Sequence, residues 1–166
     1  MDQETYLTGL RNRLLADGCE TADAEIGQYQ ALVGYRSDRL PQMLFSKIHL
    51  TTVAVPIGTA GPREVEQVVR QVGAYAKARS GRRRGAHSGV AAFAVLIADE
   101  VLPEGAEATT RPAKVEFAMR IRPAIVNLSN GSVHTFQGRQ LWGFAMNGYL
   151  QRKFALYFPA ERLERT

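Results

Sequence analysis

The stretch Val90-Ala91-Ala92-Phe93-Ala94-Val95-Leu96-Ile97-Ala98 is the longest apolar run of the chain, and it decides the fold. A run of this length is about half of what a membrane-spanning helix needs, but it fits a strand in the middle of a sheet. Strands that are covered on both faces lose the alternation of apolar and polar residues. We therefore predict a central strand from Val90 to Val101, with helices packed on the sheet.

The segments before this run predict a strand, a crossover helix and the return to the central strand. Apolar and β-branched residues favour a strand from Met43 to Ile57. Pro62 opens a helix that continues to Arg79, because proline fits the first helical position. The residues of its apolar stripe share helical spacing: Val65, Val68, Val69, Val72 and Ala76. A strand, helix and strand in this order predict a parallel crossover.

Two further elements precede the Met43–Ile57 strand. Apolar residues at helical spacing predict a helix from Gln3 to Asp17, with Gly18 as its left-handed stop. A strand is predicted from Ile26 to Arg36, followed by a turn at Ser37–Pro41. Because the connection is short, this strand and the next should pair antiparallel.

The chain after the central strand begins with a predicted loop, Leu102 to Arg111, that holds at most one helical turn. Strict alternation of apolar and polar residues then predicts a strand from Val115 that places Glu116, Arg120 and Arg122 on a solvated face. A hairpin turn is predicted at Asn130-Gly131, with Ser132 to Phe136 as the returning strand.

The final segment, 140–158, permits two interpretations. Its apolar residues fall on one helical face, which predicts a helix from Gln140 to Phe158 stopped by Pro159. The alternative places a hairpin turn at Asn147-Gly148, with Lys153 to Phe158 as a strand. The continuous polar face favours the helix.

Together these elements predict an α/β fold of the mixed α+β kind, formed as a single globular domain over residues 1–166. The predicted order is α-β-β-α-β-β-β-α, with three helices and a mixed sheet of about five strands. From Gln3 to Val101 this order resembles the restriction-endonuclease-like core. That resemblance implies an Asp and a Glu-x-Lys on the central strands, where they hold magnesium. Met43–Ile57 contains no acidic residue, so the alternative fold is a degenerate core without the metal site.

Composition indicates which partners, cysteine chemistry and cellular location to expect. Lys and Arg number 21 against 16 Asp and Glu, giving a net charge of +5 that favours acidic partners. The single cysteine, Cys19, excludes an internal disulfide and a thiolate-clamped zinc. The acidic start, Met1 to Glu4, lacks the features of a secretory signal. We expect a cytoplasmic protein with no membrane contact, no metal and no cofactor.

One segment carries most of the chemical signal. The cations Lys77, Arg79, Arg82, Arg83, Arg84 and His87 follow one another with no acidic residue between Glu66 and Asp99. A guanidinium binds two phosphate oxygens at once, and the neighbouring glycines let a backbone approach closely. The segment lacks the Gly-Lys-Ser/Thr ending of a P-loop. It is interpreted as the contact of a non-enzymatic binding or regulatory module with an anionic partner, either nucleic acid or phosphate. A solvated loop and an interface with an acidic protein are the alternatives.

Two other function classes stay open. An enzyme, or a degenerate one, would use Asp99, Glu100, His49 and Lys47, because carboxylates at the ends of parallel strands often form sites. That hypothesis requires these side chains to line one pocket. Alternatively, the aromatic C-terminal helix would form a homodimer, with Phe144 off the buried stripe as the exposed contact.

Overall fold

Two long strands that pair in parallel form the centre of the structure. This computed structural model describes residues 1–41, 46–81, 88–111, 115–116, 119–136 and 144–160. The strands are β3 (Ser46–Ala60) and β4 (Ser88–Val101), and α2 (Pro62–Gly81) connects them. Their register runs in parallel from Lys47 opposite Ser88 to Ala60 opposite Val101. The central strand and the parallel crossover predicted from the apolar run are therefore confirmed.

The sheet is mixed, and its spatial order is β1-β2-β3-β4-β6-β5, with β7 paired to β6. The outer strands are β1 (Glu20–Ile26), β2 (Tyr29–Leu40), β5 (Val115–Glu116), β6 (Met119–Asn127) and β7 (Val133–Thr135). β2 pairs antiparallel with β1 and β3, whereas β6 is parallel to β4. The antiparallel hairpin predicted at Asn130-Gly131 is confirmed by the pairing of β6 with β7.

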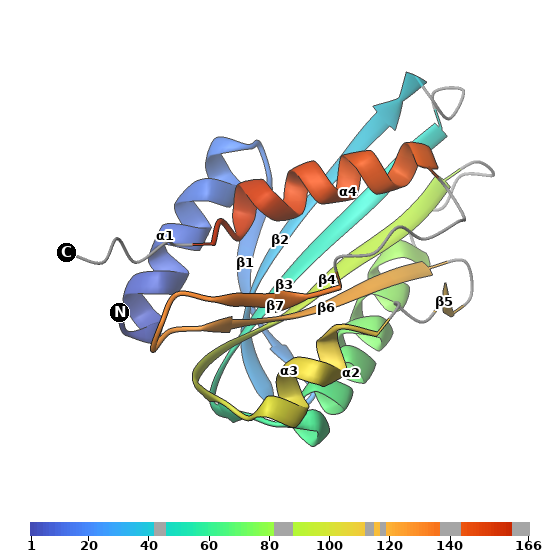
Figure 1. Ribbon diagram of the computed structural model, residues 1–166. Coiled ribbons are helices and arrows are strands. Elements are labelled where there is room, and N and C mark those ends of the chain that lie inside the picture. The colour runs from blue at the N-terminus through green and yellow to red at the C-terminus, as the bar shows by residue number, and fades with distance from the viewer. Residues whose placement is uncertain (42–45, 82–87, 112–114, 117–118, 137–143, 161–166) are drawn as a thin grey trace.

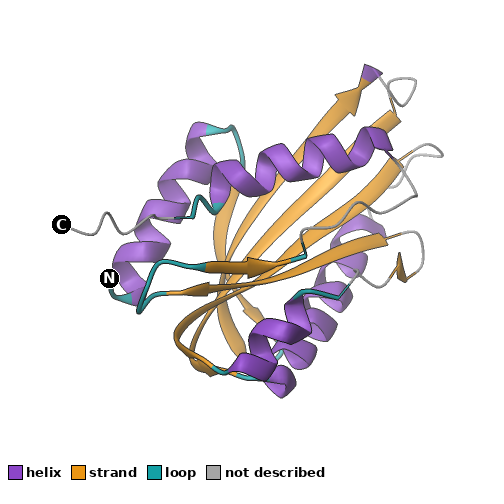
Figure 2. Ribbon diagram, in the orientation of Figure 1, coloured by secondary structure: helices purple, strands orange, loops and turns teal. Residues whose placement is uncertain are grey.

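Helices cover both faces of the sheet (Figures 1 and 2). On one face lie α1 (Gln3–Ala16) and α4 (Phe144–Tyr157), and on the other lie α2 and α3 (Pro103–Thr109). Each face has its own apolar core, one shared with α1 and α4 and the other with α2. None of the described helices is both long and apolar enough to cross a bilayer.

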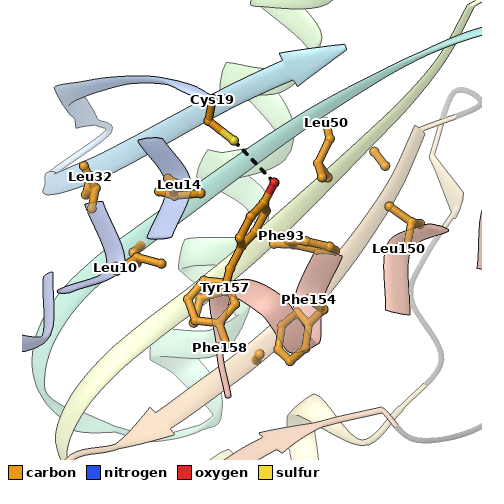
Figure 3. Close-up of a cluster of buried hydrophobic side chains, with 14 of the residues drawn as sticks. Leu10, Leu14, Cys19, Leu32, Leu50, Phe93, Leu150, Phe154, Tyr157 and Phe158 are labelled. Atoms are coloured by element: carbon orange, nitrogen blue, oxygen red, sulfur yellow. Dashed lines mark hydrogen bonds between the residues drawn. The ribbon is translucent and has the colours of Figure 1, made fainter. Parts of the chain in front are cut away.

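Figure 3 shows how α4 packs in the first of these cores. Phe93 of β4 meets the ring of Phe154 edge-on, with the ring centroids 5.3 Å apart. Tyr157 is fully buried and reaches Cys19, whose Sγ lies 3.3 Å from the Tyr157 hydroxyl. The predicted helix at the C-terminus is therefore confirmed from Phe144 to Tyr157, and the hairpin alternative is wrong.

Several predicted boundaries were wrong for identifiable reasons. Ile26 ends β1 rather than starting a strand, and Gly27 turns the chain with φ 62°, a conformation that glycine adopts without strain. β1 is an edge strand with mostly exposed or half-exposed side chains, so it shows no apolar alternation. The predicted turn at Ser37–Pro41 was also wrong, because β2 continues to Leu40.

The predicted count of elements was too low. The described structure has four helices, because the predicted single turn after β4 is the two-turn helix α3. Its sheet has seven strands where about five were predicted: β1 was missed, and the strand predicted from Val115 is divided into β5 and β6, which pair antiparallel. The N-terminal helix is confirmed over Gln3–Ala16, and Gly18 follows it in the left-handed conformation, with φ 82°.

Candidate anion-binding surface

The end of β2, the starts of β3 and β4 and the last turn of α2 meet at one end of the sheet, on the right of Figure 1. Leu40 of β2 lies opposite Ser46 of β3, and Lys47 lies opposite Ser88 of β4. α2 must end near this point because the described chain stops at Gly81 and resumes with β4 at Ser88. We call this end the basic end and define it by Arg39, Lys47, Lys77 and Arg79.

Arg39 and Lys47 form a cross-strand pair of like charge. They are direct partners in the antiparallel register of β2 and β3, and both side chains are exposed. Side chains directly opposite each other in such a ladder have Cβ atoms about 5 Å apart on the same face. That face is the one that α2 covers, since the neighbouring Tyr35 side chain contacts Arg79.

Lys77 and Arg79 come from the last turns of α2. Lys77 is exposed, whereas Arg79 is half-buried. The guanidinium carbon of Arg79 lies 4.7 Å from the centroid of the Tyr35 ring. Its Nη1 donates to the Tyr75 hydroxyl at 3.1 Å, and its Nη2 lies 3.9 Å from a carboxylate oxygen of Glu20. The two predicted cations that the structure describes therefore both lie at the basic end.

The other predicted members of this site, Arg82, Arg83, Arg84 and His87, lie outside the described residues. Sequence reasoning missed Arg39 as a site residue, because Ser37–Pro41 was interpreted as a turn. The missed signal was the even spacing of four residues from Tyr35 to Arg39, which places both on one face of an uninterrupted strand.

His49 belongs to the interior beneath this surface. It shares a face with Lys47, as the sequence predicted, but its side chain is only 2% exposed. Its Nδ1 lies 2.6 Å from the hydroxyl of Tyr35, which is itself buried. His49 thus supports Tyr35, and Tyr35 in turn supports Arg79.

The opposite end of the sheet carries acidic side chains. Asp99 and Glu100, at the end of β4, are exposed, and the exposed Glu104 follows in the first turn of α3. Glu64 lies in the first turn of α2, whereas Arg79 lies in its last turn. Asp99, Glu100 and Glu104 therefore lie at the opposite end of the strands from the basic end, whereas Asp38 and Glu20 lie close to the basic end.

The proposed enzyme constellation is not assembled. His49 pairs with Val90 at the start of β4, whereas Glu100 is at its other end. About ten residues of strand, or roughly 33 Å, separate them. Asp99 accepts a hydrogen bond from Gln3, and Glu100 accepts one from Thr59 at 3.4 Å. Among the residues that the structure describes, no His, Cys, Asp or Glu side chains form a group suited to a metal ion.

The predicted solvated face of the Val115 strand is different in the structure. Arg120 and Arg122 of β6 are half-buried under α4. Arg120 donates to the side chain of Asn147, and Arg122 lies with its guanidinium carbon 4.5 Å from the Phe154 ring centroid. Burial lowers the pKa of Arg122 from its ordinary value. The face was not recognised as covered because α4 lies far along the chain. The side chain of Glu116 is outside the described set.

A second charged cluster ties α1, β2 and α4 together. Asp17 lies 2.7 Å from Lys153 and 2.7 Å from Arg36, and Arg36 also pairs with Asp38 at 2.6 Å. Burial alone would raise the pKa of Asp17, but hydrogen bonds from Lys153, Tyr157 and Arg36 outweigh it and hold that pKa below its ordinary value. Each carboxylate of this network already has a cationic partner. The network is therefore best explained as a clamp that holds the helices on the sheet.

The aromatic residues proposed for a dimer contact are mostly interior. Tyr149, Phe154 and Tyr157 are buried, as core packing predicts. The side chain of Phe144 lies outside the described set, and so does Trp142. Leu156 is a large apolar residue of α4 that is exposed, at 49%.

No protein-family model, no characterised protein and no solved structure matches this chain. Function must therefore be argued from its own charges and geometry. Exposed cations from β2, β3 and α2 that converge on one end of a sheet are suited to an anionic partner that contacts several of them at once.

Proposed function

We propose that this chain is a non-enzymatic module that binds the phosphate backbone of a nucleic acid through its basic end. The observation that carries the proposal is the direct cross-strand pairing of Arg39 with Lys47. Like charges placed opposite each other in a ladder destabilise it by roughly 0.2–1 kcal/mol. A phosphate bound between two such cations turns that cost into favourable ion pairing.

Two further features support the proposal. The sequence adds Arg82, Arg83 and Arg84 in the segment that joins α2 to β4, between two elements of the basic end. The exposed carboxylates of Asp99, Glu100 and Glu104 lie at the other end of the strands. A polarised charge distribution of this kind orients a protein toward a polyanion during encounter and raises the association rate.

Binding without catalysis fits the residues of the central strands. In the restriction-endonuclease-like core that the element order resembles, metal-binding carboxylates lie on these strands. β3 contains Lys47 and His49 but no acidic residue. The carboxylates Asp99 and Glu100 lie at the far end of β4, away from the proposed contact.

Two double variants of equal charge test the proposal. Arg39→Ala with Lys47→Ala and Arg63→Ala with Arg70→Ala each lower the net charge from +5 to +3, that is, 5 − 2. Arg63 and Arg70 are exposed on the first half of α2, away from the basic end. Fluorescence anisotropy would measure the affinity of each variant for a labelled duplex and a labelled single strand over a range of salt concentrations.

The wild type should bind at low salt, with an affinity that falls steeply as salt rises. The Arg39/Lys47 variant should reduce the slope of log K against log salt by about 2, since each lost phosphate contact removes about 1. The Arg63/Arg70 variant should leave the slope nearly unchanged. A wild type that binds neither probe at about 50 mM salt would contradict the proposal. So would equal weakening by the two double variants.

A further inference from the structure

Arg79 of the basic end is held by an aromatic ring and a tyrosine hydroxyl. Its guanidinium lies over the Tyr35 ring, and its side chain is 26% exposed. Arg39, Lys47 and Lys77 are exposed side chains on the same end of the molecule. A side chain that is already ordered loses less rotamer entropy when it binds a ligand than a mobile side chain does.

The ring beneath Arg79 is itself fixed. Tyr35 is 7% exposed, and its hydroxyl lies 2.6 Å from Nδ1 of His49, which is 2% exposed. The Tyr35 and His49 rings are nearly parallel, with an interplanar angle of 21°. A rigid stack of imidazole, phenol and guanidinium therefore runs from the core toward the surface.

The contacts of Arg79 leave it suited to an incoming anion. Nη1 is tethered to the Tyr75 hydroxyl at 3.1 Å on the same helix. Nη2 faces Glu20 at 3.9 Å, beyond hydrogen-bond distance, and the Glu20 side chain is 74% exposed. A weak, solvated ion pair of this kind contributes little and is easily exchanged for a phosphate. A guanidinium fixed in its plane is matched to two oxygens of one phosphate.

We infer that Arg79 is the fixed phosphodiester ligand of the basic end and that Tyr35 is its positioning residue. The inference rests on the proposed function and specifies what is recognised: the backbone of the nucleic acid, whatever its base sequence. Arg39, Lys47 and Lys77 then add positive charge to the same surface. Phosphate contacts position a nucleic acid but do not read its bases.

The test exploits the difference between arginine and lysine. Arg79→Lys keeps the charge but removes the planar fork and its stacking. Arg70→Lys is the matched control, because it makes the same substitution at an exposed arginine of α2 outside the basic end. Arg79→Lys should weaken duplex binding roughly tenfold with an unchanged salt slope. Arg70→Lys should change the affinity by less than about twofold.

A double-mutant cycle tests the positioning role of Tyr35. Tyr35→Leu should weaken binding in the wild type but should have no further effect in the Arg79→Lys background. Tyr35→Phe keeps the ring and should restore most of the affinity. Circular dichroism and urea unfolding of each variant show whether it is folded, and Arg79→Lys tests the inference even where Tyr35→Leu does not fold.

The outcomes separate the two proposals. If the wild type binds and Arg79→Lys binds equally well, the inference is overturned while the proposed function stands. If the wild type binds no nucleic acid, the proposed function itself has failed. Two duplexes of equal length and scrambled sequence should bind with affinities within about twofold of each other. A strong preference between them would overturn backbone recognition.

Discussion

At the scale of single residues, the cross-strand pair of Arg39 and Lys47 connects stability to binding. Lys47→Glu would place opposite charges across the ladder, so the free energy of unfolding should rise by about 0.5–1 kcal/mol. The same change should weaken nucleic-acid binding more than Lys47→Gln, which removes the cation without adding an anion. Urea unfolding and anisotropy on the same samples would measure both effects. A Lys47→Glu protein that is less stable than Lys47→Gln would contradict the predicted repulsion.

Asp17 is the residue on which the charged clamp depends. Asp17→Asn leaves Arg36 and Lys153 without the carboxylate that they share, at side-chain exposures of 19% and 17%. Breaking such a pair should lower the free energy of unfolding by about 3 kcal/mol. Asp23→Asn is the control, since Asp23 pairs with Arg11 at 75% exposure and should matter by less than about 1 kcal/mol. If urea unfolding shows that the two variants lose similar free energies of unfolding, the charged network does not stabilise the fold as described.

The same network predicts how stability depends on pH. The folded-state pKa values of Asp17 and Asp38 are lowered, although burial alone would raise them, because hydrogen bonds from cations and tyrosines outweigh the burial. An unfolded Asp titrates near 3.9, so the stabilisation is fully present above about pH 4. It is lost as the pH falls through the lower folded-state values. Unfolding curves from pH 7 to pH 2 should show this loss for the wild type and a smaller one for Asp17→Asn. Parallel curves for the two proteins would rule the network out as the cause.

At the scale of elements, two helical glycines should respond in opposite directions to the same substitution. A Cβ at Gly148 of α4 would have Arg152 as its nearest neighbour, at an ordinary 3.5 Å, so Gly148→Ala should stabilise the protein by up to about 1 kcal/mol. A Cβ at Gly105 of α3 would lie 2.3 Å from the Ala60 carbonyl oxygen. The backbone would have to move, so Gly105→Ala should lower the midpoint of urea unfolding. A neutral Gly105→Ala would show that α3 is not packed against the end of β3 as described.

The elements that the sequence predicted well are those with a local apolar pattern. The spacing of apolar residues indicates which faces of an element are buried. It correctly predicted the strand Val90–Val101, the helix α2 with its apolar stripe and the helix α4 with its aromatic face. β1 was not predicted, because an edge strand with exposed side chains has no such apolar pattern. The polar end of β2 was taken for a turn because Ser37 and Asp38 are common turn residues.

The candidate site was predicted only in part, because strand pairing brings some of its residues together. Lys77 and Arg79 were recognisable because the cations around them are neighbours along the chain. Arg39 and Lys47 join them only through strand pairing. The arginines of β6 were misjudged because the helix that covers them arrives from the end of the chain. Sequence spacing alone specifies neither the register nor the order of strands.

At the scale of the whole molecule, the account depends on polarity along the sheet. Carboxylates lie where β4 ends, and cations lie where β3 and β4 begin. Half-buried charges hold α1, β2 and α4 together on one face of the sheet, and on the other face Arg79 is ordered against the buried Tyr35 ring. Rigidity of this kind reduces the entropy lost on binding.

The most direct test is a map of where a nucleic acid touches the protein. Amide chemical shifts of ¹⁵N-labelled protein, followed during titration with a short duplex, report that contact residue by residue. The account predicts that the largest changes fall at Arg39, Lys47 and Lys77, that is, at the end of β2, the start of β3 and the last turns of α2. Changes centred instead on Asp99, Glu100 and α3, or no changes at a saturating concentration, would contradict it.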